Sequence, residues 1–292
     1  MNHLRRYVQK IQSYYPNLII DSARFNRDGQ YNDVLILNEA LVFRFAKVQE
    51  AINTLRQEVL ILQNLQDQIS LRLPNPIYVN IQPETVGEVF VGYEIIPGEP
   101  LWREKFKQIV NVNVRKKLAA QLARFLRQLH QISLPDEITA NIPQYDNPEE
   151  WIDLYQGIRD KLFPYMRPDA QQSVAEHFEG YFGQPDRYFF EPRLRHGDFG
   201  TGNLIYSPET QAMAGIIDFG GTGMGDPAID FAGLFISFGG EFYKMCLPIY
   251  PQMEQAIERV RFYCGTFALQ EALFGIENDD KEAFWAGIKG YV

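Results

Sequence analysis

Two carboxylates and one amide lie close together in the sequence, at intervals suited to phosphoryl transfer. Asp198 and Asn203 belong to the stretch His196-Gly-Asp198-Phe-Gly-Thr-Gly-Asn203, and Asp218 follows in Ile216-Ile-Asp218-Phe-Gly. Moving a phosphoryl group leaves a protein mainly with positioning and charge stabilisation, so such a site needs divalent metal ions and an aligned acceptor. Carboxylate and amide oxygens are ligands that suit Mg²⁺. The sequence therefore predicts a site that holds a metal-bound nucleotide against a hydroxyl acceptor.

Each of these side chains has its own predicted role. We expect Asp218 to bridge the metal ions and Asn203 to complete the shell of the second ion. Asp198 is expected to orient the acceptor hydroxyl and take its proton, and His196 to brace the loop. Taken alone, each fragment also fits an ordinary turn or a capped strand. Their order, with two short predicted strands at 203–206 and 213–217 between the two acids, favours the functional interpretation.

With these residues the sequence resembles the aminoglycoside phosphotransferase family, relatives of protein kinases that include choline-kinase-like and other small-molecule kinases. The family's catalytic loop reads His-x-Asp-x-x-x-x-Asn, which His196, Asp198 and Asn203 match, and Asp218 matches its metal-binding Asp. The resemblance looks nearest to the branch that modifies the 2″ hydroxyl of aminoglycosides. It runs from about Tyr14 to the C-terminal helices.

A further stretch, Gly225-Asp-Pro-Ala-Ile-Asp230-Phe, resembles the segment that follows the metal site in this family. There the later Asp steadies the catalytic loop, so the resemblance adds Asp230 to the predicted catalytic residues. These motifs are specific to the family and not to one substrate.

The resemblance implies an α+β, bilobal, protein-kinase-like fold with a small antiparallel-sheet N-terminal lobe and a larger, mostly helical C-terminal lobe. It implies Mg²⁺ as cofactor and ATP or GTP as phosphate donor. The passage from strand to loop around Glu94 and Ile96 looks like the hinge that meets the nucleotide base, and both residues are predicted to bind nucleotide. The expected lobes are residues 1–96, for nucleotide binding, and 97–292, for catalysis and substrate binding.

A predicted strand over residues 41–47 carries two nucleotide-binding candidates. Side chains two apart share a face of a strand, so Val42 and Arg44 point together. In related kinases this pair is a small apolar residue over the base and a Lys on the phosphates, so Arg44 is a departure. Arg can still hold phosphate with two hydrogen bonds; the alternative is a charge on the outer sheet face. Glu58, on the following helix, matches the Glu that pairs with the basic residue, although it also fits an ordinary helix-surface glutamate.

The expected phosphate loop, residues 25–33, includes the candidate Asn32 but has one glycine and no GxGxxG pattern. Asn and Asp also form tight hairpins that expose backbone N–H groups. Its place before the strand of Arg44 supports the prediction more than its composition does.

Hydrophobic spacing predicts a mixed N-terminal part followed by helices. Helices are expected at 4–15, from Glu50 onward, around 118–132, and at 148–155, 172–182 and 253–274. Strands are expected at 18–23, 34–37, 41–46, 77–81 and 89–95.

Composition limits the class of protein. The chain has 292 residues, 46% hydrophobic and 22% charged, which is enough for a large core and two lobes. It has no long uncharged apolar run and no signal-peptide pattern, so we expect a cytoplasmic protein with no membrane partner. Cys246 and Cys264 lie in no CxxC pattern and are expected to be ordinary buried thiols. A net charge of −9 argues against nucleic acid as a partner; it either keeps the protein soluble or helps to attract a cationic substrate.

The predicted reaction is transfer of a nucleoside triphosphate's γ-phosphate to a small-molecule hydroxyl. An aminoglycoside-like molecule is the leading candidate for the acceptor. The stretch 232–241 holds one carboxylate among apolar residues, which weakens complementarity to a polycation. A kinase for another alcohol, of choline, homoserine, macrolide or sugar type, therefore stays open. So does a nucleotide-binding pseudokinase, favoured by Arg44 and the poor phosphate loop. A protein kinase is disfavoured because no Ala-Pro-Glu segment follows Asp218.

Overall fold

The structure is a computed structural model that describes residues 3–26, 31–185 and 189–292. The chain divides into two compact units. The first comprises residues 1–121, 132–142 and 201–222, and the second comprises 122–131, 143–200 and 223–292. Among the helices of the described residues, none has both the length and the apolar character needed to span a bilayer.

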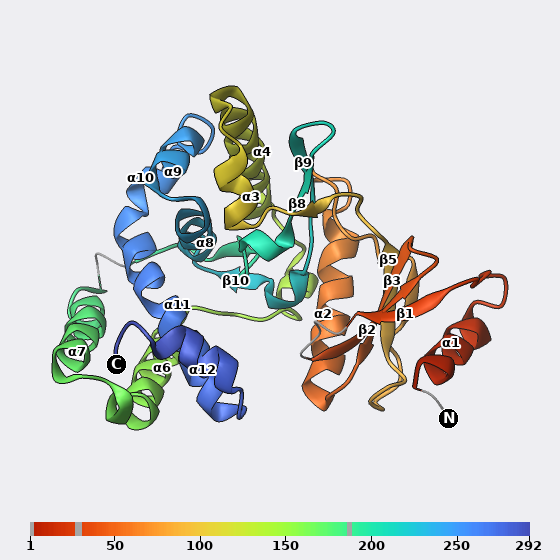
Figure 1. The fold of residues 1–292 in the computed structure, drawn as a ribbon, viewed down its shortest axis with the longest axis horizontal. Coiled ribbons are helices and arrows are strands. Elements are labelled where there is room, and N and C mark those ends of the chain that lie inside the picture. The colour runs from red at the N-terminus through yellow and green to blue at the C-terminus, as the bar shows by residue number, and fades with distance from the viewer. Residues whose placement is uncertain (1–2, 27–30, 186–188) are drawn as a thin grey trace. The chain divides into compact units, whose positions relative to one another are not determined.

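The first unit is built on a five-stranded antiparallel sheet (Figure 1). Its strands are β1 (Ala23–Asn26), β2 (Asn32–Leu37), β3 (Leu41–Ala46), β4 (Tyr78–Asn80) and β5 (Phe90–Glu94), in the order β1-β2-β3-β5-β4. Helix α1 (His3–Tyr14) precedes the sheet, and α2 (Gln49–Leu65) connects β3 to β4. The register sets Val42 of β3 opposite Tyr93 of β5, and Arg44 opposite Val91.

The two faces of this sheet have separate apolar cores, because alternate side chains of β3 point to opposite faces. Phe43 and Phe45 pack with Tyr7 and Ile11 of α1. Ala46 packs on the other face with α2 residues such as Leu55, and Val42 lies against this second cluster. Arg44 therefore comes from the face that α2 covers, where a charge needs a partner.

One predicted strand, 18–23, is wrong over most of its length, since β1 begins only at Ala23. The backbone before it is held by a side chain instead of a strand partner. The Asn38 amide donates to the Ile19 carbonyl and accepts from the N–H groups of Asp21 and Ser22. The apolar side chains there still pack on the α1 side of the sheet, which explains the strand-like pattern.

The first unit also contains a three-stranded sheet in the order β6-β8-β9. It is formed by β6 (Glu99–Pro100), β8 (Leu204–Ser207) and β9 (Ala212–Ile216). Single-turn 3-10 helices flank the hairpin at Thr201–Asn203 and Phe219–Gly221. The predicted strands at 203–206 and 213–217 thus occur within one residue of their expected limits. Helices α3 (Arg103–Gln108), α4 (Val112–Gln131) and α5 (Asp136–Thr139) follow β6, and α4 continues into the second unit.

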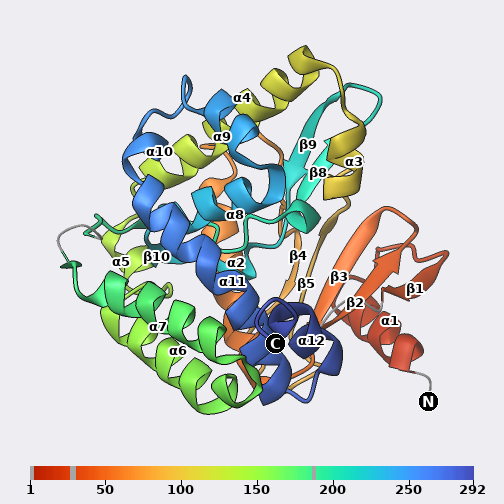
Figure 2. The same ribbon diagram turned by 60° about the vertical axis from the view of Figure 1, so that its left-hand side comes forward.

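The second unit is mostly helical, and α11 (Ile257–Glu277) is its central helix (Figure 2). It packs against α6 (Pro148–Lys161), α7 (Pro168–Phe182), α8 (Ala228–Phe238) and α12 (Lys281–Ile288). Helices α9 (Gly240–Cys246) and α10 (Gln252–Gln255) connect α8 to α11. A short antiparallel pair, β7 (Arg193–Arg195) with β10 (Gly223–Gly225), leads into the catalytic loop. The helix predicted at 253–274 is interrupted at Ala256, whose backbone has φ −88° and ψ 0°.

Gly215 of β9 allows a close approach between the hairpin and the segment after β5. A Cβ atom there would lie 2.5 Å from the carbonyl oxygen of Arg72 and 2.9 Å from the side chain of Ile96. Gly180 of α7 offers a contrast, because a Cβ atom at that position meets nothing within 4 Å.

We expect Gly215→Ala to lower the free energy of unfolding by about 1 to 3 kcal/mol, because the added methyl group pushes the Arg72 carbonyl and the Ile96 side chain away from β9. Urea unfolding followed by circular dichroism measures this change. Gly180→Ala is the control and should be neutral or more stable by up to about 1 kcal/mol. Equal stability of the two variants would contradict the close approach at Gly215.

Candidate phosphoryl-transfer site

A buried ion pair joins β3 to α2 in the first unit. One guanidinium nitrogen of Arg44, Nη1, donates to both carboxylate oxygens of Glu58, at 2.6 and 2.7 Å. The Glu58 side chain is 2% exposed and that of Arg44 13% exposed. The sheet places Arg44 toward α2, and the helix presents Glu58 to it.

The charges around Arg44 keep the guanidinium ionised. Burial disfavours its charged form, but Glu58, then Tyr93 and Asp218, raise its pKa above the ordinary value. Burial raises the pKa of Glu58, and the charge of Arg44 opposes that shift. Tyr93 accepts a hydrogen bond from Arg44, a contact that the sequence interpretation did not include.

Asp218 lies beside this pair. Its Oδ1 atom is 3.5 Å from Nη2 of Arg44, and its side chain is 49% exposed. The backbone of Asp218 is left-handed, with φ 64° and ψ 73°, which is uncommon for a residue with a side chain and is often found at functional positions. The next residue, Phe219, donates its backbone N–H to Glu58. One buried carboxylate therefore holds both the guanidinium and the turn that follows Asp218.

The β8–β9 hairpin brings Asn203 and Asp218 to the same end of one ladder. Leu204 pairs with Ile216, and beyond this pair the N–H of Ile217 donates to the carbonyl of Asn203 at 3.0 Å. Asn203 directly precedes β8, and Asp218 directly follows Ile217. The two residues therefore lie at the same end of the hairpin. The predicted metal ligands are neighbours in the fold because of strand pairing, although 15 residues separate them in sequence.

The remaining nucleotide-binding candidates occupy different surroundings. Val42 lies on the α2 face of the sheet, as Arg44 does. The exposed side chain of Glu94 pairs with Arg72 at 3.0 Å, and Ile96 packs over Gly215. Asn32 opens β2 and is buried, and its Oδ1 atom has no hydrogen-bond partner among the described residues. Residues 27–30 of the predicted phosphate loop lie outside the described residues.

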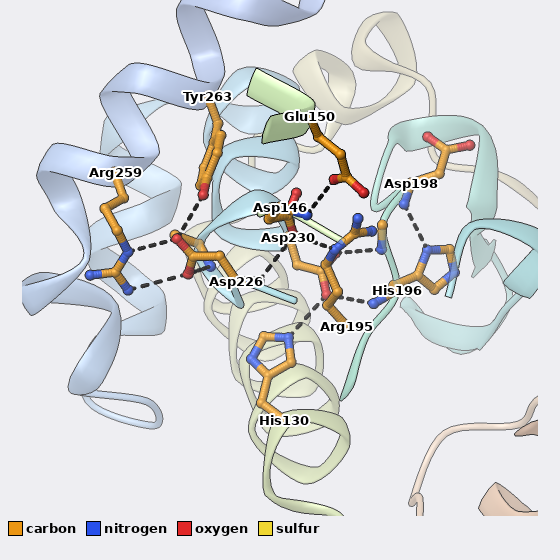
Figure 3. Close-up of polar contacts among 12 residues, drawn as sticks. His130, Asp146, Glu150, Arg195, His196, Asp198, Asp226, Asp230, Arg259 and Tyr263 are labelled. Atoms are coloured by element: carbon orange, nitrogen blue, oxygen red, sulfur yellow. Dashed lines mark hydrogen bonds and ion pairs between the residues drawn. The ribbon is translucent and has the colours of Figure 1, made fainter. Parts of the chain in front are cut away.

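Residues 196–200 of the predicted catalytic loop belong to the second unit and are held by a buried carboxylate (Figure 3). Asp230 of α8 accepts hydrogen bonds from the N–H groups of His196 and Gly197, both at 2.8 Å. The N–H of Asp198 in turn donates to Nδ1 of His196 at 3.3 Å. Asp230 and His196 are fully buried, whereas Asp198 is exposed at the end of this chain of contacts.

His130, at the end of α4, supports Asp230 from the other side. Its Nε2 atom lies 3.0 Å from Oδ2 of Asp230, and its Nδ1 atom lies 3.3 Å from the hydroxyl of Tyr250. Burial tends to raise the pKa of Asp230, but the hydrogen bond and charge of His130 and the backbone donor Gly197 lower it below its ordinary value. His130 was not among the predicted site residues, and in the sequence it is seen only as a histidine near the end of a helix.

Two further buried ion pairs stabilise the segments on either side of the loop. Arg195, directly before His196, donates from Nε to Asp146 at 2.7 Å. The same carboxylate accepts from the N–H of Asp226 at 3.0 Å, and Asp226 accepts from Arg259 and Tyr263 (Figure 3). These contacts join residues up to 80 positions apart in sequence, so no local pattern indicated them.

Within the described parts of the chain, no three His, Cys, Asp or Glu side chains gather into a metal-binding cluster. The predicted pair of Asn203 and Asp218 supplies one amide and one carboxylate. A metal ion at this pair would need further ligands, which nucleotide phosphates and water commonly provide for Mg²⁺. The two carboxylates of Glu58 and Asp218 also exceed the single charge of Arg44, which leaves negative charge for a cation to balance.

Comparison with known proteins gives a consistent result. A model of the phosphotransferase enzyme family matches residues 22–263. Viomycin phosphotransferase from Streptomyces vinaceus is 26% identical over 268 residues, which are 90% of this chain and 91% of that protein.

Solved structures with a similar fold include the GDP and kanamycin complex of APH(2″)-IIIa, with a TM-score of 0.87 and 24% identity over 97% of this chain and 96% of that one. A macrolide 2′-phosphotransferase of type I has a TM-score of 0.75 and 15% identity, over 99% and 96% of the respective chains. The predicted α+β, kinase-like fold class is confirmed.

The lowered pKa of Asp230 leads to a pH-dependent stability. A depressed carboxyl pKa stabilises the fold above the unfolded value, near 3.8, and this stabilisation is lost as the pH falls below it. We expect Asp230→Asn to cost about 2 to 4 kcal/mol at pH 7, because two N–H groups and His130 lose a charged acceptor. The difference from the unmodified protein should shrink as the pH falls below about 3.8.

Urea midpoints measured from pH 3 to pH 7 check this expectation. Asp153→Asn, which changes an exposed acid of α6, is the control and should leave the midpoint unchanged. A stability difference for Asp230→Asn that stays constant over this range would show that folding does not lower the pKa of Asp230.

Proposed function

Because the chain belongs to the phosphotransferase enzyme family and is a small-molecule kinase, we propose that it transfers the γ-phosphate of Mg-ATP or Mg-GTP to a hydroxyl of an antibiotic-like small molecule. An aminoglycoside is the leading acceptor. In this proposal residues 1–96 form the nucleotide-binding lobe and residues 97–292 the catalytic and substrate-binding lobe. The reaction takes place in the cytoplasm, where both donors are available.

The observation that carries the proposal is the grouping of Arg44, Glu58 and Asp218. A guanidinium fixed by a buried carboxylate can hold nucleotide phosphates with two parallel hydrogen bonds, and Glu58 keeps it oriented before nucleotide binds. Arg44 thus takes the role in which related kinases use Lys. The 3.5 Å approach of Asp218 puts a metal-ligating carboxylate next to that phosphate-binding group.

Asn203 and Asp218 are the residues that would hold Mg²⁺. The ion, when bound, neutralises charge that develops on the phosphate oxygens. The oxygen donors of this pair and the left-over negative charge beside Arg44 suit a hard divalent cation. The half-exposed carboxylate of Asp218 is accessible to a ligand and does not need to be uncovered.

Asp198 acts on the acceptor. Its carboxylate orients the attacking hydroxyl and accepts the proton that the hydroxyl loses as the new P–O bond forms. The two N–H bonds to Asp230 keep the loop in place, so the position of Asp198 is set before the acceptor arrives. His196 braces the loop through its bond from the Asp198 N–H.

The relatives narrow the class of acceptor. Their names include viomycin, kanamycin and macrolide substrates, which are hydroxyl-bearing antibiotics of different chemistry. A net charge of −9 favours approach of a cationic acceptor over a neutral one. We therefore rank aminoglycosides and viomycin-type basic peptides before macrolides, choline, homoserine and sugars.

A coupled nucleotide-turnover assay across these acceptors, with ATP and GTP in parallel, tests the proposal. Turnover that depends on a basic hydroxyl-bearing antibiotic supports it. Nucleotide binding without turnover on any acceptor would favour the pseudokinase alternative, and phosphorylation of generic proteins alone would favour a protein kinase.

We expect Asp198→Ala to lower kcat at least about a hundredfold, because the substrate hydroxyl loses the carboxylate that takes its proton. The nucleotide Kd, measured by calorimetry, should change by less than about threefold. Asp21→Ala, which removes an exposed acid before β1, is the matched control and should retain full kcat. Full activity of Asp198→Ala would remove Asp198 from the mechanism.

Asp218→Ala should abolish the gain in nucleotide affinity that Mg²⁺ provides, because the metal loses its carboxylate ligand. Calorimetric titrations with and without Mg²⁺ measure this gain. Glu39→Ala, at an exposed acid that pairs with Arg24, should keep it intact. An undiminished Mg²⁺ effect in Asp218→Ala would reject the metal assignment.

A further inference from the structure

Trp102 is a large aromatic side chain in an unusual setting. It directly precedes α3 and is 54% exposed, although burial of an indole is strongly favourable. Of the three tryptophans of the chain, Trp151 is buried in the second unit and Trp285 lies 55% exposed on α12. Trp102 alone among them belongs to the first unit, which holds Arg44, Glu58 and Asp218.

The segment between the predicted hinge and Trp102 pairs with β8, the strand that follows the predicted metal ligand Asn203. After Ile96 the backbone forms β6, which runs antiparallel to β8, with Glu99 opposite Tyr206 and Pro100 opposite Ile205. The N–H of Leu101 then donates to the carbonyl of Leu204 at 2.9 Å. The next residue is Trp102, so this strand pairing places Trp102 beside the start of β8.

The indole lies against the turn that carries Asn203. A Cβ atom built on Gly202 would be 3.1 Å from Cη2 and 3.4 Å from Cζ3 of Trp102, so the ring edge rests on this glycine. The ring is therefore one residue from the predicted metal ligand. Its edge is packed, and much of the remaining ring surface faces solvent.

We propose that Trp102 is a nucleotide-binding residue that packs against the nucleoside part of the bound triphosphate. This inference rests on the proposed function, because it takes the base to lie at Glu94–Ile96 and the phosphates at Asn203, Asp218 and Arg44. The sugar then lies between these two ends, along the segment that leads to Trp102. An aromatic face packs well on a sugar or base and does so without charge.

The charges around Trp102 favour a nucleoside over a polycationic acceptor. Glu99 and Lys105 form an ion pair, and the adjacent Arg103 and Glu104 carry opposite charges. The charges on both sides of Trp102 in the sequence therefore balance. A site for several ammonium groups would instead be expected to show an excess of carboxylates.

Intrinsic fluorescence tests the contact directly, without turnover. The probes are Mg-GDP, Mg-ADP, guanosine, adenosine, magnesium tripolyphosphate and an aminoglycoside, each titrated into the unmodified protein. We expect the nucleotides, and the matching nucleoside at higher concentration, to change the emission, whereas tripolyphosphate and the aminoglycoside do not. Trp285→Phe should retain the response and Trp102→Phe should lose most of it.

Steady-state kinetics provide the second measurement. Trp102→Ala should raise the KM for the nucleotide about tenfold, since aromatic contacts to bases are commonly of this strength. Both kcat and the acceptor KM should stay within about threefold of their original values. Trp102→Phe should restore the nucleotide KM to within about threefold of the original, because a ring remains. A variant that merely unfolds would lose kcat and the circular dichroism signal and would not show this split.

Several outcomes would overturn the inference. These are an emission change caused by tripolyphosphate or the aminoglycoside alone, a response that persists in Trp102→Phe, or a Trp102→Ala defect confined to the acceptor KM. Failure of the proposed function looks different: the nucleotide response of Trp102 would be present while no acceptor supports turnover. Normal turnover with an unaltered nucleotide KM in Trp102→Ala would instead reject the inference and leave the function standing.

Discussion

The ion pair between Arg44 and Glu58 is the interaction on which the nucleotide side of the site depends. Burying a glutamate beside an apolar helix face is unfavourable unless a cation and hydrogen-bond donors compensate for its lost hydration. Arg44 supplies the cation, and the N–H of Phe219 supplies a further donor. Because one carboxylate binds both Arg44 of β3 and the turn after Asp218, the proposed phosphate-binding and metal-binding groups are fixed by the same residue.

Local sequence patterns predicted this part of the site well. Strand alternation put Val42 and Arg44 on one face, and the family resemblance paired Arg44 with Glu58, as the structure has them. The two short strands around 207–210 predicted the hairpin that sets Asn203 beside Asp218. The family prediction is confirmed by the match over residues 22–263. The catalytic roles of these residues stay predictions.

Other features depend on contacts between distant residues and could not be read from local patterns. The segment 18–23 has the composition of a strand, but the Asn38 amide satisfies its backbone and removes the need for a strand partner. The contact of His130 with Asp230 joins residues 100 apart, and only Asp230 was expected, from the family resemblance, to support the loop. The left-handed backbone of Asp218 could not be read from the sequence, because Asp adopts this conformation only occasionally. Trp102 gave no sequence signal because its setting comes from the pairing of β6 with β8.

The most direct measurement is a crystal structure of the protein with Mn²⁺ and a slowly hydrolysed nucleoside triphosphate, in which anomalous scattering locates the metal. The account predicts an ion about 2.2 Å from both the Asp218 carboxylate and the Asn203 amide oxygen, bridging to the phosphates that Arg44 contacts. A metal-bound triphosphate with its ions more than about 4 Å from both side chains would contradict it.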